Sequence, residues 1–213
     1  MNGPSESDIY YTLGRSGRFE IKVRGSRFIG YAAPAVSGEI AVRLVGSMEK
    51  QFHDATHHCF AFRIGLGGNV LTRMSDGGEP SGTAGRPILE AIDRRNLTDT
   101  VCVVTRYFGG TKLGTGGLAR AYGECAAGTL DTGEITEHYV SAAVRILFGC
   151  ELTGRVMTLI QKNGCKIEKG DFQAQTRIHL RIRKSKAEQF RQDLINATSG
   201  KIQFLREDDS AEA

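Results

Sequence analysis

The stretch TRYFGGTKLGTGGLARAY, residues 105–122, combines clustered glycines with three basic side chains, Arg106, Lys112 and Arg120. Glycine loses more conformational freedom on folding than any other residue, so such a cluster indicates a sharp turn or a backbone that lies close to another group. Backbone N–H groups at a helix N-terminus, with Lys112 and Arg120 nearby, could hold an anion. A purely structural turn beside solvated cations explains the same residues, and the sequence leaves both interpretations open.

Two nucleotide-binding motifs are incomplete in this stretch. The spacing Gly114-x-Gly116-x-x-Ala119 has the form of a dinucleotide fingerprint, but it begins well after the preceding strand, and no acidic residue ends a following strand. A Walker P-loop requires Gly-Lys-Ser/Thr, whereas Leu113 follows Lys112. The sequence therefore predicts neither a Rossmann site nor a P-loop.

The segment HDATHHC places His53 and His57 four residues apart, as in the zinc motif H-E-x-x-H. Asp54 stands where that motif has its catalytic Glu, and a helix should end and a strand begin here, so the two imidazoles need not face one metal. The evidence for a cysteine protease site built from His58 and Cys59 is weaker still, because neighbouring side chains on a strand point to opposite faces. We predict no metal ion, no cofactor and no catalytic residue.

The loop SDGGEPSGTAGRP carries two acids, two hydroxyls and an arginine, namely Asp76, Glu79, Ser81, Thr83 and Arg86. Ser81 could cap the following helix, with Glu79 close to the positive end of that helix. Alternatively, these side chains line a groove that is shared with the glycine loop. That alternative requires a spatial adjacency which spacing along the chain does not establish.

The elements that must position these residues form an α+β first domain, which we predict over residues 1–137. Hydrophobic periodicity predicts five strands, at residues 19–23, 27–35, 58–65, 70–75 and 100–108. It also predicts three helices, at residues 38–52, from Pro87 onward, and at 116–130. Residues 131–138 are interpreted as a linker.

A second domain, predicted over residues 138–213, has the β-α-β-β-α-β order of ferredoxin-like domains. Its expected strands are residues 140–148, 165–170, 174–184 and 201–207, and its expected helices are 150–162 and 185–197. Alternation along the third strand places apolar side chains on one face and a basic stripe on the other. The stripe consists of Arg177, His179, Arg181 and Arg183.

The positive charge is concentrated in this second domain. Residues 1–139 hold 15 basic and 15 acidic side chains, residues 140–206 hold 13 and 5, and the tail from Glu207 holds four acids. Such a concentration of positive charge indicates a surface that binds a phosphate-rich partner. A solvated basic domain that is screened by its own acidic tail remains the alternative.

The cysteines and the apolar pattern limit the class of protein. The five cysteines are scattered without a C-x-x-C motif, which argues against a disulfide framework and a zinc knuckle and favours small buried hydrophobes; they are Cys59, Cys102, Cys125, Cys150 and Cys165. No apolar run approaches the roughly 20 residues of a membrane span. The N-terminal sequence lacks the order of a signal peptide, so we expect no membrane association and a cytoplasmic location.

Three stretches, DATHHCFAFRIG, SDGGEPSGTAGRPIL and VVTRYFGGTKLGTGGLARAY, resemble the signature of the IMPACT family. Their order and spacing are similar to those of its bacterial two-domain, YigZ-type members. The resemblance implies an N-terminal domain with the fold of the second domain of a small-subunit ribosomal protein. It also implies that the C-terminal ferredoxin-like domain resembles the last domain of elongation factor G.

Carried over position by position, the motif residues of the family form a predicted motif groove but imply no catalytic role. They fall on His58, Asp76, Glu79, Thr83, Arg86, Arg106, Tyr107, Gly109, Gly110, Gly114, Gly116, Gly117 and Tyr122. The family loop commonly carries two aspartates, and the second is replaced here by Gly77. This departure argues against a paired-carboxylate site.

These observations predict a non-enzymatic, nucleic-acid- or ribosome-associated protein that regulates translation. Its expected nucleic-acid-binding residues are Arg177, His179, Arg181, Arg183, Lys112 and Arg120. No aromatic stacking pair lies on the basic strand, so shape and backbone contact should dominate over base readout. We expect RNA or the ribosome as the partner, a protein partner in translation control as a further option, and a monomer or weak oligomer.

Two functions from other classes remain open. A nucleotide-binding enzyme of the small-molecule kinase type would use the glycine loop over ATP, because the implied first-domain fold also occurs in such kinases. A protein-binding module would present EPSGTAGRP and RYFGG as a peptide-docking groove.

Overall fold

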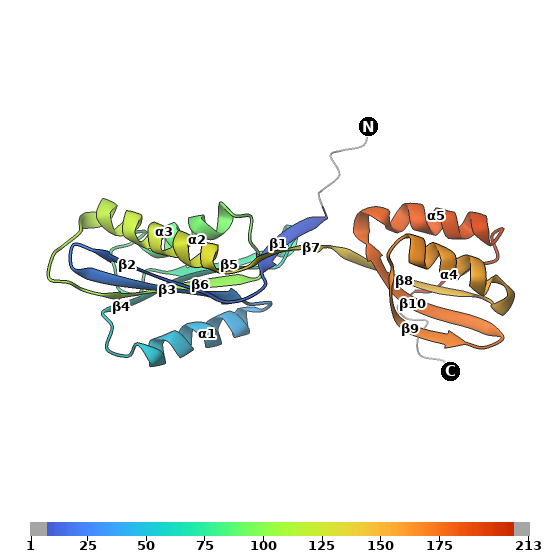
Figure 1. Cartoon of the computed structure of the whole chain (residues 1–213), viewed down its shortest axis with the longest axis horizontal. Helices are drawn as coiled ribbons and strands as arrows, with labels where there is room; N and C mark the ends of the chain where they lie inside the picture. The colour runs from blue at the N-terminus through green and yellow to red at the C-terminus, as the bar shows by residue number, and fades with distance from the viewer. Residues whose placement is uncertain (1–7, 207–213) are drawn as a thin grey trace, which may run out of the picture. The chain divides into compact units, whose positions relative to one another are not determined.

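The computed structural model describes residues 8–206, which form two compact units. The first unit is Tyr10–His138, and the second contains residues 139–206 together with Asp8 and Ile9. Each unit combines a sheet with helices, so the α+β class and the two-domain layout agree with the prediction (Figure 1). Asp8 and Ile9 belong to the second unit, although the sequence pattern assigns them to the first domain.

The first unit is built on a five-stranded antiparallel sheet with strand order β2-β3-β6-β4-β5. Its strands are β2 (Gly17–Val23), β3 (Ser26–Pro34), β4 (His57–Ile64), β5 (Leu71–Ser75) and β6 (Thr100–Tyr107). The central strand β6, TVCVVTRY, is buried along nearly its whole length because both faces of the sheet are covered. A 3-10 turn (Gly67–Asn69) lies between β4 and β5.

Helices cover both faces of this sheet (Figure 1). Helix α1 (Gly38–Gln51) packs on one face in a core that includes Val101 and Val103 of β6. Helices α2 (Gly85–Asp93) and α3 (Gly114–Thr132) pack on the other face with Cys102 and Val104. Alternation along one buried strand therefore divides the apolar side chains between two cores.

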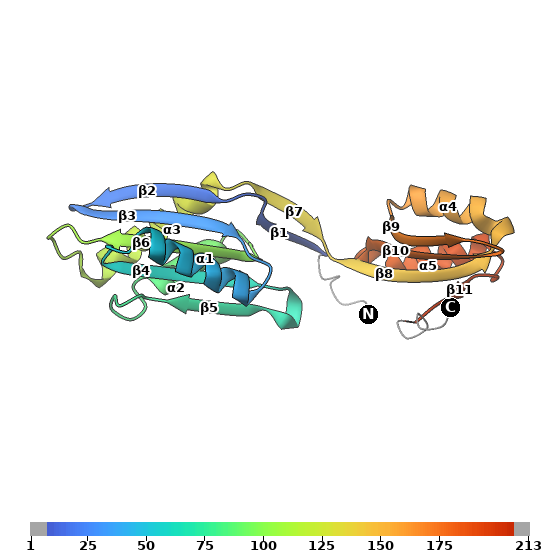
Figure 2. The same cartoon turned by 90° about the horizontal axis from the view of Figure 1, so that it is seen from below.

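Two further strands contradict the sequence analysis. Strands β1 (Ile9–Leu13) and β7 (Ile135–Tyr139) pair as a two-stranded ribbon, where we predicted a linker and no strand (Figure 2). Strand β7, ITEHY, is almost entirely exposed and lacks a clear apolar alternation. Because its partner lies over 120 residues away in the chain, local sequence carries little signal for this pairing.

The second unit follows the predicted β-α-β-β-α-β order, with an antiparallel sheet of strand order β11-β8-β10-β9. Its elements are β8 (Ser141–Gly149), α4 (Thr153–Lys162), β9 (Lys166–Phe172), β10 (Gln175–Arg183), α5 (Ala187–Ala197) and β11 (Gln203–Phe204). Short 3-10 turns (Cys150–Leu152 and Lys184–Lys186) precede the helices. The last strand is shorter than the predicted residues 201–207, of which Glu207 lies outside the described residues.

Both helices of the second unit pack on the same side of its sheet (Figure 1). Ile178, Leu180 and Ile182 of β10 are buried in one core with apolar side chains of α4 and α5. The side chains that alternate with them lie on the opposite face, which we call the open face. Among the described residues no helix covers this face.

Three cysteines are buried, as predicted, and two are not. Cys59, Cys102 and Cys125 lie in the first-unit core, Cys165 is half-buried and Cys150 is exposed. Burial raises the pKa of Cys59 and of Cys125 to about 12, and it also raises the pKa of Cys102. The residues with described structure contain no helix that is both long and apolar enough to cross a membrane.

We expect a thiol reagent at pH 8 to label Cys150 first and the three core cysteines only on unfolding. The thiolate is the reactive species. Burial disfavours its formation and also keeps the reagent from reaching the sulfur. Absorbance of the released thiolate measures the rates with and without denaturant. The core thiols should react at least about tenfold more slowly in the native protein. Equal rates for all five cysteines would contradict this core assignment.

Candidate functional site

The second and third sequence motifs meet at the buried carboxylate of Glu79 in the first unit, and His57 Nε2 of the first motif lies 3.9 Å from Glu79 Oε2. Arg106 from the end of β6 donates Nη1–H to Glu79 Oε1 at 2.6 Å. Tyr122 from α3 donates its hydroxyl to the same oxygen at 2.7 Å. The Arg106 and Glu79 side chains are only 5% and 4% exposed. The fold thus provides the adjacency that sequence spacing left open.

The Arg106 guanidinium is held from several sides. Its Nη2 donates to Ser26 Oγ at 3.1 Å, and the same oxygen accepts the backbone N–H of Gly109 at 3.1 Å. The guanidinium carbon lies 5.4 Å and 5.5 Å from the ring centroids of Phe28 and Phe108. The sequence analysis missed Ser26 and Phe28, because both come from β3 and Ser26 lies 80 residues from Arg106 in the chain. Phe108 lies within the third motif, but the sequence analysis gave it no role.

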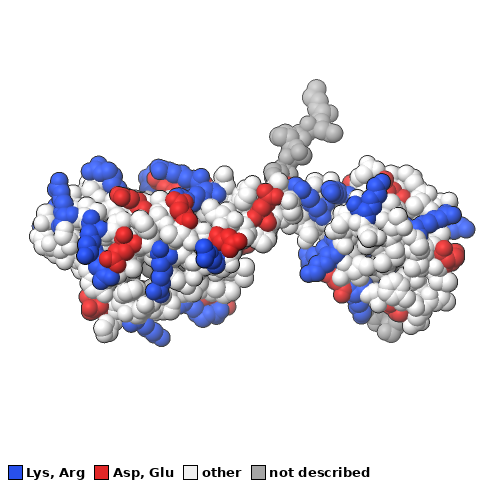
Figure 3. Space-filling view, in the orientation of Figure 1, with Lys and Arg blue, Asp and Glu red and all other residues white. Residues whose placement is uncertain are grey.

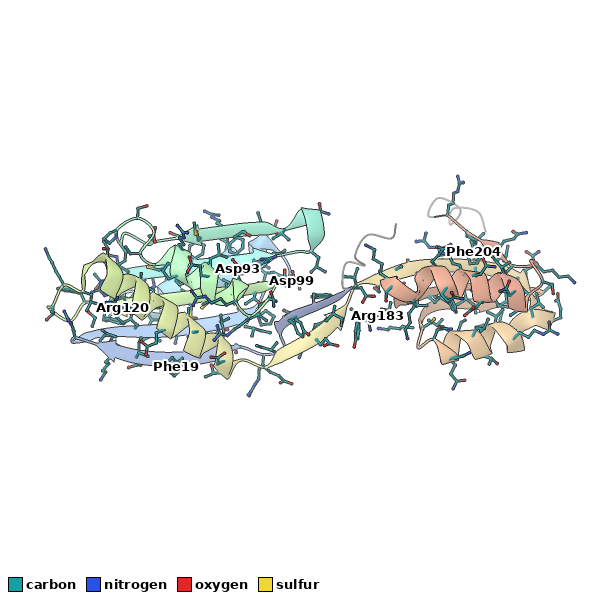
Figure 4. All side chains as sticks on the ribbon, turned by 90° about the horizontal axis from the view of Figure 1, so that it is seen from above. Phe19, Asp93, Asp99, Arg120, Arg183 and Phe204 are labelled. Atoms are coloured by element: carbon teal, nitrogen blue, oxygen red, sulfur yellow. The ribbon has the colours of Figure 1, made fainter. Side chains whose placement is uncertain are left out.

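A cleft of about 340 Å³ lies beside this network, and we call it the motif cleft. Glu79 and Arg106 line it together with residues of the glycine loop and of the first turns of α3; those residues are Lys112, Leu113, Gly114, Thr115 and Leu118. Arg120, labelled in Figure 4, lines two other clefts. The two cations that we expected around one helix N-terminus are therefore divided between different clefts.

The acidic loop is organised by Asp76 rather than by Ser81. Asp76 Oδ1 accepts the backbone N–H groups of Ala84 and Gly85, and its Oδ2 accepts that of Gly82, each at 2.9 Å. Partial burial alone would raise the pKa of Asp76, but these three donors hold it below its ordinary value. Asp76 therefore caps the start of α2, and the predicted Ser81 cap is wrong.

Gly77, where the resemblance implies a second aspartate, occupies a position that requires glycine in this chain. Its φ is +54°, and a Cβ there would overlap the backbone carbonyl of His58. A side chain is therefore excluded by both the backbone conformation and the available space.

Several other motif residues make structural contacts outside the motif cleft. His58 Nδ1 lies 3.1 Å from Thr105 Oγ1, and Tyr107 donates its hydroxyl to Asp54 at 2.7 Å. The Thr83 hydroxyl donates to the carbonyl of Pro80, and Arg86 pairs with Glu90 on the exposed side of α2. Within residues 8–206 no group of three metal-ligating side chains occurs.

The glycines of the third motif have different environments. Gly109 lies so close to Gly25 that a Cβ on it would overlap the backbone of Gly25 and Ser26. Gly110 and Gly114 have φ values of +85° and +71°, with open space where a Cβ would lie. Gly116 and Gly117 belong to the first turn of α3. Only Gly114 of this group lines the motif cleft.

The basic stripe on the open face of the second unit is partly neutralised. Arg181 Nε donates to Glu168 at 2.6 Å. Arg183, labelled in Figure 4, donates to Asp8 at 2.7 Å and lies over the Tyr139 ring. Hydrogen bonds from Arg183 hold the pKa of Asp8 well below its ordinary value. Two of the three predicted arginines therefore have carboxylate partners within the second unit.

Three cations gather around His179 on the same face. His179 is directly opposite Arg145 on β8 and Lys169 on β9, and Arg177 is its next neighbour on that face of β10. Burial and then the charges of Arg145, Lys169 and Arg177 lower the pKa of His179. We call these four residues the basic cluster. Asp171 is the acidic residue directly opposite Arg177.

Sequence reasoning identified two members of the basic cluster and missed Arg145 and Lys169. Arg145 is the one charged residue within the apolar strand VSAAVRILF, and this position was the sequence signal that could have identified it. Only the strand register shows that Arg145 and Lys169 flank His179. On the view of the first unit in Figure 3, by contrast, basic and acidic side chains intermingle.

Solved structures resemble the whole chain. A crystal structure of a hypothetical protein has 26% identity and a TM-score of 0.66, with 95% of this chain and 100% of that chain covered. A crystal structure of a protein from Thermus thermophilus has 11% identity and a TM-score of 0.51, covering 95% of this chain and 29% of that one. The second likeness shows the fold alone.

Residues 24–130 match the Impact N-terminal domain, and residues 142–201 match a domain of unknown function, DUF1949. The IMPACT family member YvyE of Bacillus subtilis is 31% identical over 192 residues, covering 90% of this chain and 88% of that protein. YigZ of Escherichia coli is 34% identical over 188 residues, covering 86% and 91%. A Thermus thermophilus IMPACT family member is 40% identical over 162 residues, covering 75% and 86%. The chain belongs to the IMPACT family.

Proposed function

We propose that this protein is a non-enzymatic, nucleic-acid- or ribosome-associated regulator of translation that contacts the phosphate backbone of RNA through the basic cluster. The observation that carries the proposal is the position of Arg145, Lys169 and Arg177 around His179 on an open sheet face. Like charges repel one another in the free protein, so a polyanion that approaches this face relieves the repulsion.

The surrounding charge supports the same interpretation. Residues 140–206 hold 13 basic side chains against 5 acidic ones, so the second unit attracts polyanions beyond the cluster itself. Arg177 and Lys169 form no ion pair with another described residue, whereas Arg181 and Arg183 do. The first two are therefore the better candidates for phosphate contact, and the paired arginines contribute less than the stripe alone suggests.

Family membership supports a role related to translation control in general terms. The likeness to ribosomal-protein and elongation-factor domains, inferred from the sequence motifs, adds to the case for RNA as the partner. Backbone contact without base readout fits a cluster of cations that is not interleaved with stacked aromatic rings.

RNA affinity should fall by about tenfold or more when Arg145, Lys169 and Arg177 are all replaced by alanine, and equally for every RNA sequence. The salt dependence should also weaken, with the slope of log K against log salt reduced by about 2 because three phosphate contacts are lost. Fluorescence anisotropy of labelled RNA between about 50 and 200 mM salt measures both quantities.

A matched control removes three cations from the helix side of the same unit. Lys162, Lys186 and Lys201 are exposed at or beside the ends of α4 and α5. Their replacement by alanine changes the net charge equally and should weaken RNA binding much less. Equal weakening by the two triple variants would refute a specific role for the basic cluster, and absence of RNA binding by the unmodified protein would refute the proposed function.

A further inference from the structure

The polypeptide leaves the sheet of the second unit beside the basic cluster. Strand β11 lies at the edge of this sheet, next to β8 (Figure 2). Phe204 is directly opposite Ile146, and the next residue, Leu205, donates its backbone N–H to the carbonyl of Arg145 at 3.0 Å. Phe204 and Ile146 pack in the core, so alternation places Leu205 and Arg145 on the open face. The last described residues therefore lie one strand away from the basic cluster.

The residues that follow carry the charge opposite to that of the cluster. Residues 207–213, EDDSAEA, contain four acidic side chains and no basic one, and we call them the acidic tail. They lie outside the described residues. The cluster contains three permanent cations, of which Lys169 and Arg177 form no ion pair with another described residue. The two segments are therefore complementary in charge.

The acidic tail is long enough to cross the basic cluster. Neighbouring strands lie about 4.8 Å apart, so the distance from β11 across β8 and β10 to β9 is about 14 Å. An extended chain advances about 3.3 Å per residue, so seven residues span up to about 23 Å. The acids at 207–209 can thus reach Arg145 and His179 in the middle of the sheet, and Glu212 can reach Lys169 on β9.

We propose that the acidic tail docks on the basic cluster of the same molecule and competes with RNA for it. Exposed ion pairs are individually weak. Covalent attachment, however, gives the tail a local concentration in the millimolar range, at which several weak pairs together occupy the cluster. Only a partner with several closely spaced phosphates then displaces the tail. The competition rests on the proposed function, whereas docking of the tail does not.

The pKa of His179 reports on docking without any RNA. Arg145, Lys169 and Arg177 lower this pKa, and Glu168 acts in the opposite direction. Carboxylates of a docked tail favour the imidazolium form, so removing their charge should lower the pKa of His179 further. The test variant is the full chain in which the four tail acids are replaced by their amides, namely Glu207→Gln, Asp208→Asn, Asp209→Asn and Glu212→Gln. An NMR titration of the imidazole at about 50 mM salt compares this variant with the unmodified protein.

A matched control removes the same number of negative charges away from the open face. Four exposed glutamates on α1 and at the beginnings of α4 and α5 are changed to glutamine; they are Glu39, Glu49, Glu151 and Glu188. The pKa of His179 should change much less in this control. Docking is overturned if the tail variant leaves the pKa of His179 unchanged or if the control lowers it equally. A shift that depends on protein concentration would assign the contact to the tail of a second copy and would also overturn the proposal.

RNA binding tests the competition separately. The tail variant should bind RNA about tenfold more tightly than the unmodified protein at about 50 mM salt, and the difference should shrink at about 200 mM. The control variant should gain much less affinity. If the pKa of His179 shows docking but RNA affinity is unchanged in the tail variant, the competition is refuted. If no variant binds RNA, the proposed function fails, and the His179 titration still decides whether the tail docks.

Discussion

Replacing Glu79 by alanine should lower the free energy of unfolding by about 3–5 kcal/mol, because it leaves the Arg106 guanidinium buried without its counter-charge. The two side chains are 4% and 5% exposed, and their closest atoms are 2.6 Å apart. The substitution also removes the acceptor of the Tyr122 hydroxyl, which lies in the same core. An unpaired buried charge and an unpaired buried hydroxyl both disfavour the folded state.

Urea denaturation followed by circular dichroism measures this loss, and two further variants test its cause. The double variant Glu79→Leu with Arg106→Met removes both charges and should recover the part of the lost stability that comes from the unpaired charge, but not the part that comes from the Tyr122 hydroxyl. Glu90→Ala breaks exposed pairs with Arg86 and Arg94, and it should change stability by no more than about 0.5 kcal/mol. A Glu79→Ala loss no larger than that of Glu90→Ala would contradict the buried-pair interpretation.

Replacing Gly109 by alanine should lower the free energy of unfolding by about 2–4 kcal/mol, because no space exists for a Cβ. The added atom would overlap the backbone of Gly25 and Ser26, so the turn that joins β2 to β3 must move. That movement also displaces Ser26 Oγ, which accepts bonds from Arg106 and from the Gly109 N–H. The loss therefore reaches the buried Glu79 network.

Gly116→Ala is the control for this prediction, and its effect should have the opposite sign. Gly116 lies in α3, and a Cβ there would meet only the end of the Arg120 side chain, at 3.8 Å. Alanine favours the helix over glycine by up to about 1 kcal/mol, so this variant should be more stable than the unmodified protein. The melting temperatures of the two variants, each compared with that of the unmodified protein, test this prediction. If both variants lose stability equally, general loop flexibility rather than close backbone approach explains the glycines.

Local sequence predicts those elements whose pattern is set by burial on one face. Alternation in QTRIHLRIR places Ile178, Leu180 and Ile182 in the core, and the structure confirms that they are buried. The apolar spacing of α1 likewise predicts its buried face through Ala41 and Val45. In both cases the signal is strong because apolar residues recur with the period of the element, about 2 residues in the strand and about 3.6 in the helix.

Pairing between distant segments has no comparable local signal. Glu79 and Arg106 are 27 residues apart, Glu79 and Tyr122 are 43 apart, and Ser26 and Arg106 are 80 apart. Their contacts depend on strand register and on how α3 packs against the sheet. The exposed ribbon of β1 and β7 was missed for the same reason.

The amino-acid pattern alone predicts the α+β class, the order of elements in the second unit, the family and the excess of positive charge in residues 140–206. The three-dimensional fold then shows which of those charged side chains form ion pairs. It brings Glu168 to Arg181 and Asp8 to Arg183, and it places Arg145 and Lys169 around His179. Ion pairs form only between side chains a few ångströms apart. Those distances depend on which strands pair and in which register, and local periodicity does not determine that.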